Sequence, residues 1–194
     1  MKKIISGIIL LLLFITCSSA NDYKLNSPDG KIIITIKTKP GLEWSVNYDN
    51  REIISLIKAG MVTETNKAFG ENETVRKATY GNINQELIPV VANKRSKITD
   101  NCNTLTITFK SGFGVQFRAY NDGVAYRFET SLKDDIIIKN EISDIQFPAG
   151  SYSWYPLEDS FMSHNERIYR YSSLDTIAQK HLASLPTLFV ANGV

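Results

Sequence analysis

FGVQFRAYNDGVAYRFE, residues 113–129, is the stretch that decides how this chain folds. On both sides of Asn121-Asp122-Gly123, apolar and polar residues alternate with a period of two, which places each set on one face of a strand. Asn and Asp tolerate a left-handed backbone and Gly accepts a positive φ, so these three residues predict a reversal. The stretch therefore predicts a β-hairpin with one apolar face, which a second sheet must cover. That face consists of Val115, Phe117, Ala119, Val124, Tyr126 and Phe128.

The rest of the chain favours an all-β fold, because short apolar alternations follow one another between turns. Predicted strands span residues 31–37, 42–48, 52–56, 74–80, 86–92, 104–110, 135–139, 142–147, 152–155 and an extended segment 181–190. Residues 93–103 are polar and predict an exposed connection, and a short helical turn is expected near residues 172–177. The fold class is therefore a large antiparallel β-sandwich with few or no helices.

Charge and cysteine content exclude some classes of protein. Without Lys2 and Lys3, the 22 basic residues become 20, against 20 acidic residues. A neutral domain without a basic run is a poor nucleic-acid binder, because that affinity depends on neutralised phosphates. If an N-terminal segment that contains Cys17 is removed, Cys102 is the remaining cysteine, and no disulfide can form within the chain. A buried or half-buried thiol is then expected at Cys102.

The N-terminus predicts a secretory signal peptide over residues 1–20 and a sandwich domain over residues 21–194. Two lysines precede an apolar run, residues 4–15, which is short for a membrane span and is followed by small residues up to Ala20. Cys17 supports an alternative, lipid attachment as in bacterial lipoproteins. The expected location is secreted and periplasmic, free or anchored through Cys17, with no transmembrane span.

No complete catalytic or metal-binding constellation is visible. His164 and His181 are far apart in sequence and lack a cysteine partner, so a metal site built on them is not expected. The acidic pairs at residues 134–135 and 158–159 are adjacent, and neighbours on a strand point to opposite faces. They are interpreted as solvated loop charges.

The segment rich in aromatic residues, 152–156, is a candidate sugar contact. Sugar rings stack on aromatic faces through their C–H groups, while carboxylates and guanidinium groups take the hydroxyls. The candidate contact residues are Trp154, Tyr155, Glu158, Glu166 and Arg167. The alternative is that Trp154 and Tyr155 alternate between the core and the surface of an ordinary strand.

Several stretches together resemble the N-terminal domain of glycoside hydrolase family 97, found in Bacteroidetes. They are SPDG at residues 27–30, YNDGVAYRF at 120–128, Trp154-Tyr155, and Leu185-Pro186 before a closing strand. The hairpin motif is the most specific of them, and the resemblance covers residues 23–194.

The resemblance implies a galactose-mutarotase-like supersandwich packed against a catalytic (β/α)8 barrel, in an α-glucosidase or α-galactosidase whose active site holds calcium. The catalytic carboxylates belong to the barrel, and the calcium-ligating Glu of the sandwich falls after Val194, so no catalytic or metal residue carries over. A barrel needs roughly 250 residues, whereas 194 residues less a leader of 20 leave 174. The chain alone is expected to be inactive and to hold no cofactor, with calcium implied for the parent enzyme.

Two functions follow as expectations. The first is a non-catalytic, carbohydrate-associated N-terminal domain, incomplete at its C-terminus, whose partners are the parent's barrel and an α-linked oligosaccharide. The alternative is a free-standing carbohydrate-binding or surface lipoprotein β-sandwich module. A third hypothesis, a purely structural interaction domain, involves no sugar contact.

Overall fold

The computed structural model describes residues 22–91, 94–164, 166–177 and 181–194. The predicted signal peptide and Cys17 lie outside these residues. The expected all-β fold is confirmed, since strands dominate and one short 3-10 helix, Leu174–Thr176, lies where a helical turn was predicted. Within the described residues, no helix has the length and apolar character needed to span a membrane.

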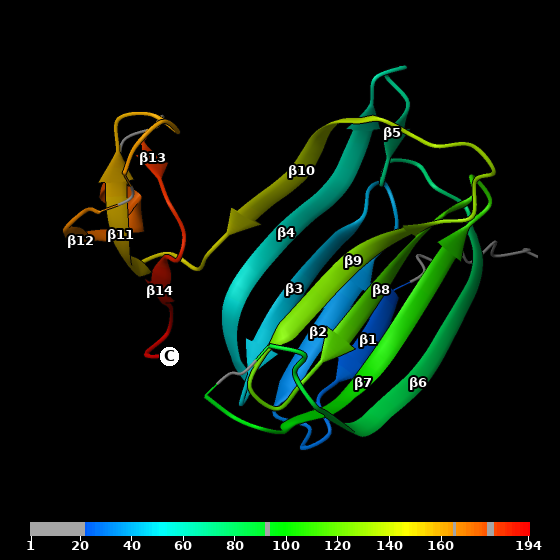
Figure 1. The fold of residues 1–194 in the computed structure, drawn as a ribbon, viewed down its shortest axis with the longest axis horizontal. Coiled ribbons are helices and arrows are strands. Elements are labelled where there is room, and N and C mark those ends of the chain that lie inside the picture. Colours follow the sequence, from blue (N-terminus) through cyan, green and yellow to red (C-terminus); the bar gives the residue numbers. More distant parts are fainter. Residues whose placement is uncertain (1–21, 92–93, 165, 178–180) are drawn as a thin grey trace, which may run out of the picture.

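The first sheet has the strand order β1-β2-β3-β4-β10, with β5 paired to β4, and every pairing is antiparallel (Figure 1). Its strands are β1 Asp22–Asn26, β2 Ile32–Lys37, β3 Glu43–Tyr48, β4 Arg51–Thr63, β5 Ala68–Phe69 and β10 Ile138–Gln146. The strand predicted at residues 31–37 is present as β2, and alternate residues of it are buried. The predicted strands at 135–139 and 142–147 are one strand, β10, instead of two.

The second sheet contains the central hairpin and has the order β6-β7-β8-β9. Its strands are β6 Val75–Leu87, β7 Ile98–Phe109, β8 Phe113–Ala119 and β9 Val124–Thr130. The register pairs Val115 with Phe128 and Phe117 with Tyr126, so the predicted hairpin and its apolar face are confirmed. Gly123 does not have a positive φ, whereas Gly30, in the turn between β1 and β2, does.

The pairing of β6 with β7 differs from the sequence prediction. The two strands pair from Val75 with Phe109 to Leu87 with Ile98, so one long strand replaces the two predicted at 74–80 and 86–92. The predicted exposed connection at 93–103 is wrong in its second half, because β7 begins at Ile98. Backbone hydrogen bonds pair these strands whatever their side chains are. Because the side chains are mostly polar, the sequence shows no hydrophobic alternation that would predict the strands.

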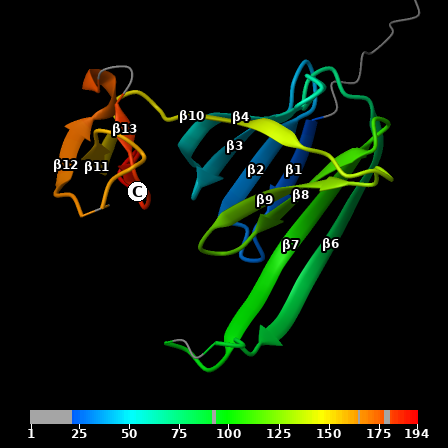
Figure 2. The same ribbon diagram turned by 45° about the horizontal axis from the view of Figure 1, so that its top comes forward.

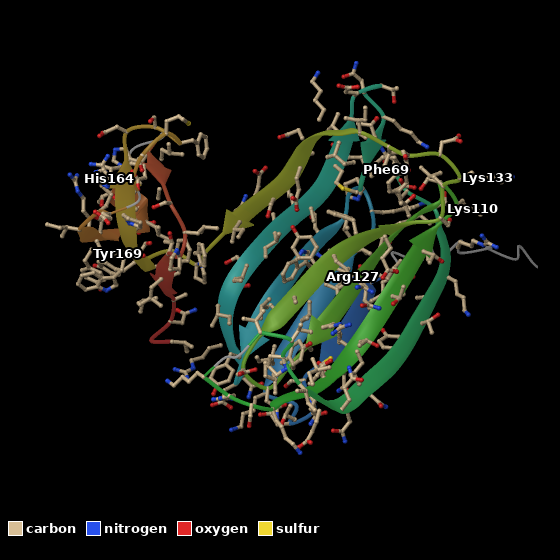
Figure 3. The ribbon with its side chains drawn as sticks, in the orientation of Figure 1. Phe69, Lys110, Arg127, Lys133, His164 and Tyr169 are labelled. Carbon is tan, nitrogen blue, oxygen red and sulfur yellow. The ribbon has the colours of Figure 1, made fainter. Side chains whose placement is uncertain are left out.

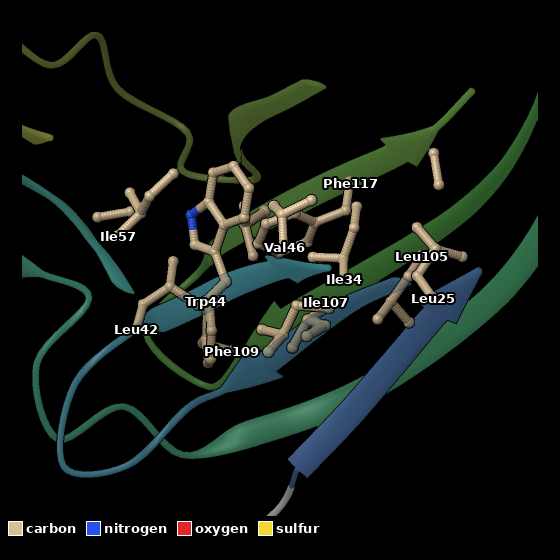
Figure 4. Packing of buried hydrophobic residues seen from close by; sticks show 14 of the residues in the cluster. Leu25, Ile34, Leu42, Trp44, Val46, Ile57, Leu105, Ile107, Phe109 and Phe117 are labelled. Atoms are coloured by element: carbon tan, nitrogen blue, oxygen red, sulfur yellow. The ribbon is translucent and has the colours of Figure 1, made fainter. Parts of the chain in front are cut away.

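The two sheets pack face to face around one hydrophobic core (Figure 4). Trp44 of β3 makes edge-to-face contacts with Phe117 of β8 and Tyr126 of β9, with ring centroids 5.6 and 5.4 Å apart. The most deeply buried aliphatic side chains come from both sheets: Ile34, Ile36, Val46, Leu105, Ile107 and Val115. Cys102 is also fully buried, as expected.

A small third sheet follows β10 and lies beside the sandwich (Figures 1 and 2). Its strands are β11 Tyr152–Glu158, β12 Tyr169–Ser173, β13 Leu182–Ala183 and β14 Leu188–Val190. β11 pairs with the other three, and the extended segment predicted at 181–190 is divided into β13 and β14. Asn192 links this sheet to the sandwich, because its Nδ2 donates a hydrogen bond of 2.6 Å to the carbonyl oxygen of Glu52.

Candidate functional site

One face of the small sheet carries stacked aromatic rings. The register places Trp154 of β11 opposite Tyr171 of β12, so their side chains share a face. The ring of Tyr171 lies between two neighbours: its centroid is 5.1 Å from that of Tyr152 and 4.8 Å from that of Trp154. The three residues are 40%, 43% and 50% exposed in the order Tyr152, Trp154, Tyr171. They form an open aromatic face, named here the aromatic platform.

Tyr155 points away from the aromatic platform, as alternation along β11 requires. It is 6% exposed, so its ring has little surface that a ligand could contact, whereas Trp154 is 43% exposed. The sequence prediction paired Trp154 with Tyr155, but the structure groups Trp154 with Tyr152 and Tyr171. The period of two within β11, and again between Tyr169 and Tyr171, is the signal that could have identified the platform.

Glu158, at the end of β11, is the centre of a buried polar cluster. Its carboxylate accepts hydrogen bonds of 3.0 Å from Arg167 Nε and from Ser184 Oγ, and its side chain is 3% exposed. Hydrogen bonds from Ser163, Arg167 and Ser184 lower the pKa of the Glu158 carboxyl below its ordinary value. The guanidinium of Arg167 reaches a second carboxylate as well, with Nη2 3.2 Å from Asp159 Oδ2.

This cluster ties the end of β11 to Arg167, which lies in the connection between β11 and β12. A lowered pKa keeps Glu158 ionised at neutral pH, whereas a general acid needs a raised one. Glu158 is therefore suited to accept hydrogen bonds and to position Arg167. It is not suited to donate a proton to a leaving group.

An open hollow of about 590 Å3 lies next to Arg167. It is lined by Leu157, Asp159, Glu166, Arg167, Ile168 and Arg170. Glu166 is exposed, and its backbone N–H donates to His164 Nδ1 at 3.0 Å. Figure 3 shows the side chains of His164 and Tyr169 with the small sheet, well apart from Arg127 on the sandwich. The structure thus brings Glu158, Glu166 and Arg167 together, while Trp154 lies on the aromatic platform.

A second polar cluster, on the sandwich, was missed by the sequence analysis. Asp100 of β7 is 7% exposed, and its carboxylate accepts hydrogen bonds from Gln85 Nε2 at 3.0 Å and Tyr120 Oη at 2.9 Å. These bonds, together with the charge of Arg118 3.8 Å away, lower the pKa of the Asp100 carboxyl. The outward-facing Arg118 and Tyr120 of the hairpin motif were the available signal, because both need polar partners.

Among the residues that the structure describes, no three His, Cys, Asp or Glu side chains come together in a way that could hold a metal ion.

Several known proteins are similar to this chain. A retaining alpha-galactosidase of Bacteroides thetaiotaomicron is 28% identical over an alignment of 195 positions, gaps included, which covers 96% of this chain and 29% of that protein. A solved Glycoside Hydrolase Family 97 enzyme from Pseudoalteromonas sp. strain K8, in complex with panose, matches with a TM-score of 0.75 at 21% identity. That match covers 88% of this chain and 27% of the solved one.

A solved beta-arabinopyranosidase matches with a TM-score of 0.75 at 20% identity, over 87% of this chain and 29% of that one. At such identities the structural likenesses show the fold. The chain spans less than a third of the length of each of these relatives. The sequence profile of a family described as Glycosyl-hydrolase 97 N-terminal matches residues 25–194, and this chain belongs to that family.

Proposed function

We propose that this chain is the non-catalytic N-terminal domain of a secreted α-glycosidase. It supports a (β/α)8 catalytic barrel that these residues do not form, and it helps to line the sugar site of the parent enzyme. The observation that carries this proposal is the small sheet, in which the aromatic platform occurs together with the cluster of Glu158, Arg167 and Glu166. The family and the short coverage of its relatives support the assignment.

The two parts of the small sheet supply different contacts to an α-linked oligosaccharide. Trp154 and Tyr171 present ring faces on which sugar C–H groups stack. Arg167, held in place by Glu158, and the exposed Glu166 offer a donor and an acceptor for hydroxyls. The substrate is an α-glucoside or an α-galactoside.

A direct test measures chemistry and binding separately. The purified chain should release no nitrophenol from p-nitrophenyl α-glucoside or α-galactoside, with or without calcium, and calcium should not shift its unfolding temperature. Calcium-dependent turnover by the chain would overturn the proposal.

Sugar binding is measured by titrating maltose and an α-galactobiose into the chain and its variants. Trp154→Ala should weaken binding by about threefold to tenfold, the range expected for one aromatic contact. Tyr80→Ala is the matched control, because Tyr80 is a 55% exposed aromatic residue on β6 of the sandwich. Equal loss in both variants, or no loss in either, would exclude the platform as a sugar contact.

A free-standing carbohydrate-binding module is the second candidate, favoured because the aromatic platform is open without any partner domain. The genomic reading frame after the codon for Val194 discriminates between the two. Continuation into a strand with a Glu and then a barrel supports the enzyme domain, and a stop codon supports the module.

A further inference from the structure

The long pairing of β6 with β7 produces an arm that projects from the sandwich (Figure 2). The last residue of β8 in the sheet, Ala119, pairs with Asn103 of β7. Beyond that position, β6 and β7 pair with each other alone, from Ile83 with Cys102 to Leu87 with Ile98. A two-stranded ribbon is marginal in water by itself, and the buried Asp100, bonded to both Gln85 and Tyr120, fastens this one to the sheet.

The tip of the arm is apolar and exposed. Leu87, Ile88, Val90 and Val91 are 43%, 76%, 104% and 78% exposed, respectively. Single exposed aliphatic residues are ordinary on protein surfaces, but four within five positions of one narrow projection form a contiguous patch. Among the residues that the structure describes, none covers these side chains.

Positive charge accompanies the apolar tip. Lys94, Arg95 and Lys97 are exposed on the returning side of the same turn. Residues 86–97 contain one acidic residue in the sequence, Glu86, whose Oε2 is 2.8 Å from Lys97 Nζ. Three cations against one anion leave the tip positive, although the chain as a whole has a formal charge of only +2.

We propose that this tip, residues 87–91 and 94–97, docks on an anionic lipid surface. Its aliphatic side chains enter the interface and its cations face the lipid headgroups. The proposal rests on the proposed secretion of the protein into the periplasm, a compartment bounded by membranes. Aliphatic residues rimmed by lysines fit a lipid interface, whereas the centre of a protein interface is enriched in aromatic residues and depleted of lysine.

The test is flotation of the chain from Asn21 onward with vesicles of phosphatidylcholine, with and without phosphatidylglycerol. The chain should float with the anionic vesicles at low salt and much less at high salt. The triple variant Ile88→Ser, Val90→Ser, Val91→Ser should partition at least tenfold more weakly. Lys94→Gln and Arg95→Gln should each reduce partitioning about fivefold.

Matched controls change the same chemistry elsewhere. Phe161→Ser with Met162→Ser removes side chains that are 88% and 94% exposed on the small sheet's long connection, and Lys110→Gln with Lys133→Gln removes two exposed cations of the sandwich. Both controls should float like the unchanged chain. All variants are at exposed positions, so their unfolding midpoints should match, which separates loss of binding from loss of fold.

Three results would overturn the proposal: no flotation of the unchanged chain, equal flotation with neutral vesicles, or full flotation of the triple tip variant. Light scattering without lipid tests a different occupant. If the unchanged chain is an oligomer and the tip variant a monomer, the tip binds a second copy of this chain instead of lipid. The sugar-binding assay is independent of these variants, so failure here leaves the proposed function standing.

Discussion

Asn121 Oδ1 accepts a hydrogen bond of 3.0 Å from the backbone N–H of Asp29, which joins the turn of the central hairpin to the turn between β1 and β2. The two turns belong to different sheets, so this bond connects the layers of the sandwich at one end. The turn at Asp29 is itself held by Ser27, whose Oγ donates to Asp29 Oδ1 at 2.6 Å. Gly30 completes it with a φ of 75°. Both turns lie in the motifs that resemble the family, and their hydrogen bond is a physical reason for an asparagine at position 121.

Replacing Asn121 should weaken this connection between layers. Asn121→Ala should lower the free energy of unfolding by about 1 kcal/mol, because one hydrogen bond is lost at an exposed site. Asp122→Ala, at the next and equally exposed position, should change it by less than about 0.5 kcal/mol. Urea denaturation measures both. Equal midpoints would mean that the bond does not contribute.

A side chain at Gly70 should destabilise the fold more than one at Gly150. Both residues have a positive φ, of 94° and 77°. A Cβ on Gly70 would meet the carbonyl oxygen of Ala59 at 2.5 Å, whereas one on Gly150 meets nothing within 4 Å. Gly150→Ala should therefore cost about 1 to 2 kcal/mol from backbone strain alone. Gly70→Ala should cost clearly more, because β4 and β5 must also move apart. Similar losses for the two variants in thermal unfolding would contradict this reading.

Replacement by alanine should change the free energy of unfolding differently at two buried serines of the small sheet. Ser151 and Ser153 are each 1% exposed. Ser151 Oγ donates to the carbonyl oxygen of Pro148 at 2.7 Å, but Ser153 Oγ has no partner among the described residues. Ser151→Ala should cost about 1 kcal/mol, and Ser153→Ala should be neutral or stabilising, because it removes an unsatisfied buried hydroxyl. A destabilised Ser153→Ala protein would show that the hydroxyl does have a partner.

Glu158 should make the stability of this chain depend on pH in the acid range. Its pKa is lowered in the folded state, so its contribution is complete above the ordinary carboxyl pKa of about 4.3. That contribution is lost as the pH falls through the lower, folded value. Glu158→Gln should be less stable at neutral pH, and its unfolding temperature should fall less steeply on acidification.

The measurement is thermal unfolding followed from about pH 7 to about pH 3, the range in which carboxylates titrate. Glu64→Gln, at an exposed carboxylate of the sandwich, is the control and should leave the unfolding temperature at neutral pH unchanged. Parallel curves for Glu158→Gln and the unchanged chain would show that Glu158 carries no share of the acid sensitivity.

The sequence by itself determined the central hairpin, the all-β class and the family. In the hairpin, local alternation and the hydrophobic face act together: a slip of one residue would turn Phe117 and Tyr126 away from Trp44, so the pattern allows one register. The motif around Asn121 was specific enough to indicate the family.

Tertiary structure alone decided the arm, the polar clusters and the aromatic platform. Asp100 was predicted to be exposed because its neighbours are polar, but it is buried by bonds to Gln85 and Tyr120, which lie 15 and 20 residues away in sequence. Trp154 was identified as a candidate contact, yet the ring beside it comes from Tyr171 on another strand. Hydrophobic periodicity records which face of a strand is buried, whereas a hydrogen bond or a ring stack depends on which strands become neighbours, and pairing across the sheet fixes that.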